Sequence, residues 1–247
     1  MLKSSFEATY IMPYVHTPGN FQVLKKSISE LIPLMDRLQV IIVECGLTPR
    51  IKDMNLKTDY IHIQSNIWNV GWMFNCGMKN SRTDKIFFGS FEYIPRMDLI
   101  KKILDDSPNG FILLQEGVSD TTMEDINNNK IPSPVPCPEE GITYMDKTTY
   151  SKIGGWDENI LGDKLYNIQQ RRNKMLVPIQ SINGHNVIKL LIQVPMESKS
   201  EFEKSEKYYE RLIKLDNDKL MSYIRSQGKK IGNMEKYSET ELIEFDG

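Results

Sequence analysis

Short apolar runs alternate with longer stretches of helical spacing over the first two-thirds of the chain. The apolar runs, which predict strands, cover residues 8–12, 40–43, 60–63, 85–88 and 110–114, and regular structure is expected to resume at residues 141–145. The stretches with helical spacing cover residues 21–38, 71–80, 96–105 and 147–153. Pro33 should kink or split the first of these helices. Strands that alternate with helices indicate right-handed crossovers and a mostly parallel sheet.

The last part of the chain has a different pattern. Residues 120–140 are rich in Asp, Asn and Pro, which predicts a long surface excursion. Residues 201–227 form a charged stretch with apolar positions at helical spacing, and Gly228 is a candidate for its end. We therefore expect one domain over residues 1–195 and a helical C-terminal extension over residues 196–247 that packs on it.

Composition narrows the class of protein. The 247 residues are 40% hydrophobic, enough for one sizeable core, and the net charge of -2 does not favour nucleic acid or an anionic membrane surface. No apolar run approaches the roughly 20 residues that span a bilayer. The three cysteines have neither metal-ligand nor disulfide-framework spacing, and the N-terminus lacks an apolar signal region. These features predict a reducing, cytoplasmic location.

Three predicted strands end in residues suited to ligand binding. Open parallel sheets bind ligands beyond the carboxyl ends of their strands. Here these ends carry Pro13-Tyr14, Glu44 and the segment 89–92. Glu44 could accept hydrogen bonds from a base or a ribose; the alternative is a solvated turn residue.

The order of these motifs resembles the family 2 glycosyltransferases and their relatives, which share the GT-A fold. The resemblance rests on Pro13-Tyr14, on the apolar strand that ends in Glu44, on Asn75-x-Gly77, and on the Gly-Gly-Trp-Asp-Glu segment at residues 154–158. It covers roughly residues 8 to 190, and Gly-Gly-Trp-Asp-Glu is its most specific part. It implies a single α/β domain of GT-A type, with a mixed, mostly parallel sheet flanked by helices.

The resemblance also implies an activity. It predicts the transfer of a sugar from a nucleotide-sugar donor, with UDP favoured, to the hydroxyl of a glycan, a lipid carrier or another acceptor, with inversion. Pro13, Tyr14, Glu44 and Asn75 are then expected on the donor side. The acceptor side would hold Trp156, as a platform for a sugar ring, and Glu158.

The metal-binding turn departs from the family pattern. The family places Asp-x-Asp after its fourth strand, where a carboxylate holds Mn²⁺ or Mg²⁺ against the diphosphate. Here Gly89 and Phe91 occupy these two positions. Glu92 could supply the carboxylate, with His185 completing the metal shell. The alternative is that the turn is only structural and that Arg171, Arg172 and Lys174 neutralise the diphosphate.

The catalytic base departs from the pattern as well. The family carries an acidic pair on a helix after Gly-Gly-Trp-Asp-Glu, and this chain has Lys164-Leu165 there, with Asp163 one position earlier. Asp163 is the first candidate for the base that deprotonates the acceptor, and Asp157 the second. The alternative for Asp163 is a helix N-cap.

Two other functions remain open. A GT-A fold without its metal turn and acidic pair could be a non-catalytic module that binds a nucleotide or glycan, or acts as a scaffold. A nucleotidyltransferase is the weaker alternative, because no Gly-rich phosphate loop follows the first strand. The oligomeric state, including a homo-oligomer, stays open.

Overall fold

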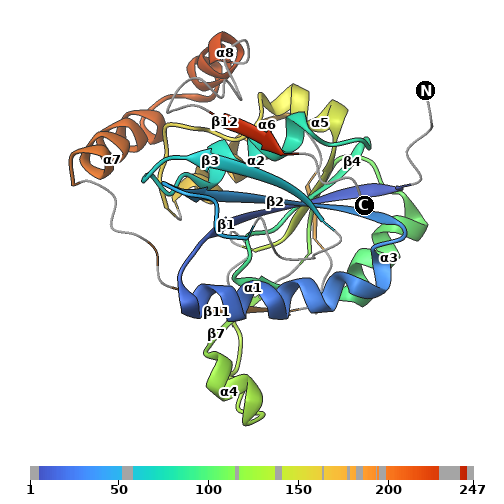
Figure 1. The fold of residues 1–247 in the computed structure, drawn as a ribbon. Helices are drawn as coiled ribbons and strands as arrows, with labels where there is room; N and C mark the ends of the chain where they lie inside the picture. Colours follow the sequence, from blue (N-terminus) through green and yellow to red (C-terminus); the bar gives the residue numbers. More distant parts are fainter. Residues whose placement is uncertain are drawn as a thin grey trace.

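A computed structural model gives the structure of the chain (Figure 1). It describes residues 6–51, 58–114, 117–136, 141–162, 164–176, 179–181, 186–192, 194, 199–227 and 240–243. These residues form an eight-stranded sheet in the order β10-β6-β9-β4-β1-β2-β3-β12. Strands β4, β1, β2 and β3 run parallel to one another, whereas β9 and β12 pair antiparallel with their neighbours. The predicted mixed, mostly parallel sheet is therefore confirmed.

The strands of this sheet include every predicted one. They are β1 (Ala8–Val15), β2 (Leu38–Gly46), β3 (Asp59–Gln64), β4 (Lys85–Phe88), β6 (Phe111–Leu113), β9 (Thr143–Asp146), β10 (Ile179–Ser181) and β12 (Thr240–Ile243). All eight residues of β1 are buried, as are the first eight of β2. Both strands lie in the middle of the sheet, where helices cover both faces, which explains their nearly continuous apolar sequences.

Helices cover both faces of the sheet (Figure 1). One face carries α1 (Pro18–Leu31) and α3 (Met97–Asp106), and the other carries α2 (Val70–Lys79), α5 (Lys147–Ile153) and α6 (Lys164–Leu176). Thr17 begins α1 by accepting a hydrogen bond from the backbone N–H of Asn20. The helix ends at Leu31 and is followed by a 3₁₀ turn (Ile32–Leu34), so Pro33 does end the regular helix as predicted.

Helix α2 packs closely against β1. A Cβ atom on Gly77 would lie 2.3 Å from Cγ2 of Ile11. Only glycine allows this approach, because real Cβ atoms do not come within 3.0 Å of another heavy atom. The glycine of the Asn75-x-Gly77 motif is thus explained by helix–sheet packing.

The predicted surface excursion contains regular structure. A second sheet has the order β5-β11-β7-β8 and comprises β5 (Tyr93–Ile94), β11 (Asn186–Leu190), β7 (Gly117–Thr121) and β8 (Val135–Pro136). Between β7 and β8 the short helix α4 (Met123–Asn127) projects from the body of the protein (Figure 1). The sequence pattern did not predict these strands; β5 and β8 have only two residues each, and β7 has polar residues at its last three positions.

The C-terminal stretch forms two helices rather than the predicted single one. They are α7 (Lys199–Ile213) and α8 (Asn217–Gln227). Asp216 separates them and accepts a hydrogen bond from the backbone N–H of Lys219 at the start of α8. Asp favours such positions before a helix, so the chain breaks here despite the continuous apolar spacing. Gly228 lies outside the described residues.

Within the described ranges, no helix is long and apolar enough to cross a membrane.

Candidate functional site

Strands β1 and β2 bring two predicted donor-side residues together. In their parallel register Tyr14 pairs with Glu44, and Glu44 pairs in turn with His62 of β3. The backbone carbonyl of Pro13 accepts a hydrogen bond from the N–H of Phe91 at 3.2 Å. Pro13, Tyr14, Glu44 and the turn after β4 therefore meet at one edge of the sheet. We call this edge the donor edge.

Glu44 is completely buried at the donor edge. Its Oε2 atom accepts hydrogen bonds from the backbone N–H groups of Arg50, at 3.0 Å, and Ile51, at 3.4 Å, and from the hydroxyl of Tyr60. Its Oε1 atom has no hydrogen-bond partner among the described residues. The interpretation of Glu44 as a solvated turn residue is wrong, because β2 continues to Gly46 and holds this side chain inside the protein.

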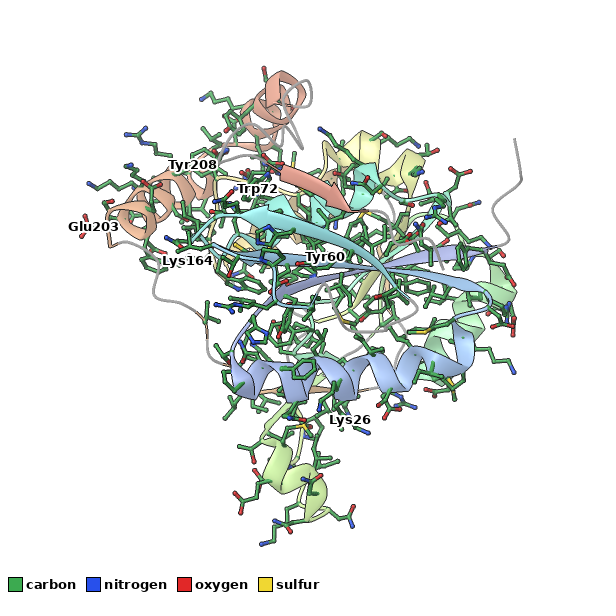
Figure 2. All side chains as sticks on the ribbon, viewed as in Figure 1. Lys26, Tyr60, Trp72, Lys164, Glu203 and Tyr208 are labelled. Carbon is green, nitrogen blue, oxygen red and sulfur yellow. The ribbon has the colours of Figure 1, made fainter. Side chains whose placement is uncertain are left out.

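Tyr60 is a partner of Glu44 that the sequence analysis missed. Figure 2 shows Tyr60 in the middle of the molecule, on β3. Burial raises the pKa of the Tyr60 hydroxyl, and its hydrogen bond to Glu44 raises this pKa further. It thus stays protonated and donates to the carboxylate. The contact between Tyr60 on β3 and Glu44 on β2 can be predicted only when the register of these two strands is known.

The position of the first metal-turn carboxylate has no room for a side chain. A Cβ atom on Gly89 would lie 2.1 Å from the hydroxyl oxygen of Tyr10 and 3.0 Å from Cγ1 of Ile142. Tyr10 is fully buried, so it cannot easily move away. An aspartate at residue 89 would require the core around β1 to rearrange.

The position of the second carboxylate is part of an aromatic cluster. Phe91 is fully buried, with its ring edge-to-face against Tyr14 at 5.1 Å between centroids and against Trp68 at 6.3 Å. The hydroxyl of Ser27 on α1 donates to the carbonyl of Phe91 at 2.6 Å. This turn is therefore anchored on both sides by apolar packing and by α1.

The two residues proposed for a metal site do not form one within the described structure. Glu92 is only 8% exposed. Burial raises the pKa of the Tyr10 hydroxyl, and the negative charge of the nearby Glu92 carboxylate raises it further. The carboxylate of Glu92 is thus turned toward the interior. His185 lies outside the described residues. The described parts of the chain contain no group of three or more His, Cys, Asp or Glu residues that could hold a metal ion.

Asn75 and the Gly-Gly-Trp-Asp-Glu segment form a buried hydrogen-bonded cluster. The Nδ2 atom of Asn75 donates to the carbonyl of Trp156 at 2.9 Å and to Oε1 of Glu158 at 2.8 Å. Its Oδ1 atom accepts from the hydroxyl of Tyr150 at 2.6 Å and from the N–H of Trp156 at 3.0 Å. With all these bonds made inside the protein, Asn75 holds the segment against α2.

Trp156 is also part of this buried cluster. It is 1% exposed, and its ring packs against Phe74 at 4.9 Å and Phe88 at 5.5 Å between centroids. The ring faces the core in this structure, so it does not offer an open platform for a sugar.

Asp157 makes contacts that link three elements. Its Oδ1 atom accepts from the N–H of Asn159 at 3.0 Å. Its Oδ2 atom forms an ion pair with Arg172 of α6, in which both side chains are 3% exposed, and accepts from the hydroxyl of Tyr208 on α7 at 3.1 Å. Arg172 and Tyr208 were not expected to meet Asp157. A buried arginine must find a carboxylate, but the sequence does not say which one.

The two arginines of α6, Arg171 and Arg172, make contacts that stabilise the fold. Arg172 pairs with Asp157, while Arg171 donates to the carbonyls of Leu212, at 3.2 Å, and Leu215, at 2.5 Å. An arginine at these carbonyls caps the C-terminal end of α7. Both guanidinium groups are thus engaged, and Lys174 is the exposed cation of this helix among the three that were considered for the diphosphate.

A cleft lies between the Gly-Gly-Trp-Asp-Glu segment and α7. It has a volume of about 260 Å³ and is lined by Ile67 after β3, by Glu158, Asn159 and Leu161, and by residues of α7 that include Lys204 and Tyr208. Figure 2 shows Tyr208 and Lys164 where α7 meets the rest of the molecule. Lys164 forms an ion pair with Glu206 there. We call the cleft between the Gly-Gly-Trp-Asp-Glu segment and α7 the acceptor-side cleft. The first candidate base, Asp163, lies outside the described residues.

The two described cysteines are not nucleophiles. Cys45 and Cys76 are free and buried. Burial raises the pKa of each thiol to about 12, so both stay protonated at neutral pH.

Comparison with known proteins identifies the fold. No family model matches the chain, and no curated protein sequence does. Among solved structures, TarS residues 1–349 of S. aureus in complex with UDP-GlcNAc superposes with a TM-score of 0.55 at 11% identity, covering 89% of this chain and 72% of that one. The mannosyltransferase PcManGT of Pyrobaculum calidifontis, in complex with GDP-Man and Mn²⁺, gives 0.51 at 11% identity, covering 90% and 73%. The chain has the GT-A fold that the sequence resemblance predicted.

Proposed function

We propose that this protein is a glycosyltransferase that moves a sugar from a nucleotide-sugar donor, with UDP as the favoured nucleotide, to a hydroxyl of a glycan, lipid-linked or other acceptor. Two proteins of the same fold are solved with nucleotide sugars, UDP-GlcNAc in one and GDP-Man in the other. Their identity to this chain is 11%, so the proposal depends on the site itself. The two free thiols suit a reducing compartment, and a cytoplasmic location is part of the proposal.

The observation that carries the proposal is the buried carboxylate of Glu44. Burying an acceptor oxygen without a partner is costly, and native proteins rarely do so without a reason. Oε1 of Glu44 is such an oxygen within the described structure, at the edge where open α/β sheets bind ligands. A donor N–H of a base or a ribose hydroxyl would satisfy it. Pro13 and Tyr14 lie beside this position on β1.

On the acceptor side we propose Asp163 as the general base and Asp157 as the second candidate. The oxygen of the acceptor hydroxyl attacks the anomeric carbon as its proton passes to the carboxylate. The bond from that carbon to the diphosphate breaks, and its electron pair leaves with the nucleotide, which gives inversion. Asp157 ranks second because Arg172 and Tyr208 already engage its Oδ2 atom. Asn75, Trp156 and Glu158 would position the loop beside the acceptor.

The test is calorimetric titration with UDP, GDP and UDP-sugars, on the wild type and on Glu44→Gln. The amide oxygen of glutamine can replace Oε2 and keep its three donors, while the NH₂ group replaces the unpartnered oxygen with a donor. The variant should therefore fold normally and bind the preferred nucleotide at least about tenfold more weakly. Glu30→Gln, at a half-exposed ion pair with Lys26 on α1, is the control and should bind like the wild type. If no nucleotide binds the wild type, the proposed function is wrong.

A non-catalytic binding module is the second candidate. The apolar turn at residues 89–91 favours it, because Gly89 and Phe91 exclude the carboxylates that the family uses there. The two candidates differ in turnover: a transferase slowly hydrolyses or transfers its donor sugar, whereas a binding module leaves the bound nucleotide sugar intact. Release of UDP from the best-binding UDP-sugar decides between them.

A further inference from the structure

His16 lies at the donor edge, directly after β1. Its Nδ1 atom is 2.8 Å from the hydroxyl oxygen of Tyr14, the residue that pairs with Glu44 across the sheet. The side chain is half-buried, so a ligand at this edge can reach it. Neither the sequence pattern nor the family resemblance gave this histidine a role.

Aromatic contacts connect His16 to the turn that replaces the metal site. The ring of Tyr14 lies edge-to-face against Phe91 on one side and against His16 on the other, with centroid distances of 5.1 Å and 6.0 Å. The ring of Phe21 on α1 contacts His16 from a further side at 6.2 Å. The phenylalanine that stands in place of the carboxylate thus supports the tyrosine that orients the histidine.

The hydrogen bond to Tyr14 fixes which nitrogen of His16 can serve a ligand. Burial and the nearby carboxylate of Glu44 raise the pKa of the Tyr14 hydroxyl, which therefore keeps its proton and can donate it to Nδ1. An imidazole that accepts at Nδ1 carries its own proton on Nε2. Within the described residues no hydrogen bond engages Nε2. His16 can thus offer an N–H donor at this edge.

A metal ion does not fit the turn beside it. Tyr10 fills the space that a side chain on residue 89 would need, and Phe91 is enclosed by Tyr14 and Trp68. Glu92 is buried, and the described parts of the chain contain no group of three or more His, Cys, Asp or Glu residues that could hold a metal ion. The charge of a diphosphate leaving group still has to be stabilised by donors held in place before the reaction.

We propose that this protein binds the diphosphate of its donor without a divalent cation and that the Nε2–H of His16 donates a hydrogen bond to it in place of the metal. This inference rests on the proposed function, since it concerns the same donor. It assigns Tyr14 as a positioning residue, which holds the histidine ring rather than contacting the phosphates.

The experiment compares UDP with uridine, each titrated in EDTA and in Mn²⁺, because only UDP carries the diphosphate. We expect the affinity for UDP to be the same within about twofold in both buffers. His16→Gln should weaken UDP binding by roughly tenfold or more, as expected for a lost hydrogen bond to a charged group, and leave uridine binding unchanged. Lys101→Ala removes an exposed cation from α3, away from His16, and should change neither affinity.

The outcomes separate this inference from the proposed function. Tighter binding of UDP by tenfold or more in Mn²⁺ would overturn the inference while supporting a nucleotide-sugar enzyme. Equal loss of UDP and uridine binding in His16→Gln, or no loss of either, would also overturn it. Absence of binding by UDP, GDP and their nucleosides would overturn the proposed function and this inference together. Tyr14→Phe should reproduce part of the loss for UDP alone.

Discussion

The acidic residue at the donor edge and the one in the loop beside the acceptor-side cleft differ in how their carboxylate oxygens are hydrogen-bonded. At the donor edge, Oε2 of Glu44 accepts hydrogen bonds from the hydroxyl of Tyr60 and from the backbone N–H groups of Arg50 and Ile51. Its Oε1 atom has no hydrogen-bond partner in the described structure. In the loop, both oxygens of Asp157 are engaged, by Asn159 and by Arg172 with Tyr208. The Gly-Gly-Trp-Asp-Glu segment, the most specific motif of the sequence, thus serves mainly to hold the structure together. Glu44, whose motif is less specific, keeps an oxygen that can still accept a hydrogen bond from a ligand.

The largest expected effect comes from breaking the buried ion pair of the loop. Arg172→Met should destabilise the protein by about 3–5 kcal/mol, because the carboxylate of Asp157 would stay buried without its cation. Arg96→Met is the control, since Arg96 pairs with Asp98 in an exposed position and should cost less than about 1 kcal/mol. Urea unfolding of both variants measures the difference. Equal losses would contradict the structural role of Asp157.

Replacement of Asn75 should have the next largest effect. Asn75→Ala removes the buried hydrogen bonds that Asn75 makes to the N–H and carbonyl of Trp156 and to the carboxylate of Glu158. We expect a loss of about 3 kcal/mol, from several unsatisfied buried groups. Asn80→Ala loses one hydrogen bond, to the carbonyl of Cys76, at a less buried helix end and should cost about 1 kcal/mol. A loss for Asn75→Ala no larger than this would mean that the cluster does not hold the loop.

The smallest expected effect concerns the turn at the donor edge. Gly89→Ala should cost about 2 kcal/mol, because the new methyl group would overlap the hydroxyl of Tyr10. Tyr10→Phe removes the closest atom, an oxygen without a hydrogen-bond partner in the described structure, and should restore part of the loss in the double variant. A thermal unfolding cycle of the four proteins measures this coupling. Independent effects would show that residue 89 can accept a side chain.

The fold was predictable where the apolar pattern was strong. Strands β1 and β2 are buried along almost their whole length, which matches the nearly continuous apolar runs that predicted them. Short elements such as β5 and β8, with two residues each, gave no pattern. The break at Asp216 was missed because apolar positions continue across it at helical spacing.

The site was less predictable, because sequence motifs do not state which partner a side chain will have. Glu44 was found by its place at a strand end, but its hydrogen-bond partner Tyr60 comes from the neighbouring strand and was not predicted. Trp156 was expected to be a platform for a sugar ring, and its packing against Phe74 and Phe88 places it in the core. His16 gave no signal, since its contact with Tyr14 follows from the geometry at the end of β1. Asp163 and His185 stay predictions.

The most direct test of the account is a crystal structure of the protein with a UDP-sugar bound. We predict that the nucleoside lies at the donor edge, with a donor group within hydrogen-bond distance of Oε1 of Glu44, and that its sugar points toward the acceptor-side cleft. A nucleotide bound elsewhere, with Glu44 still without a partner, would contradict the central claim that this buried carboxylate serves a donor nucleotide.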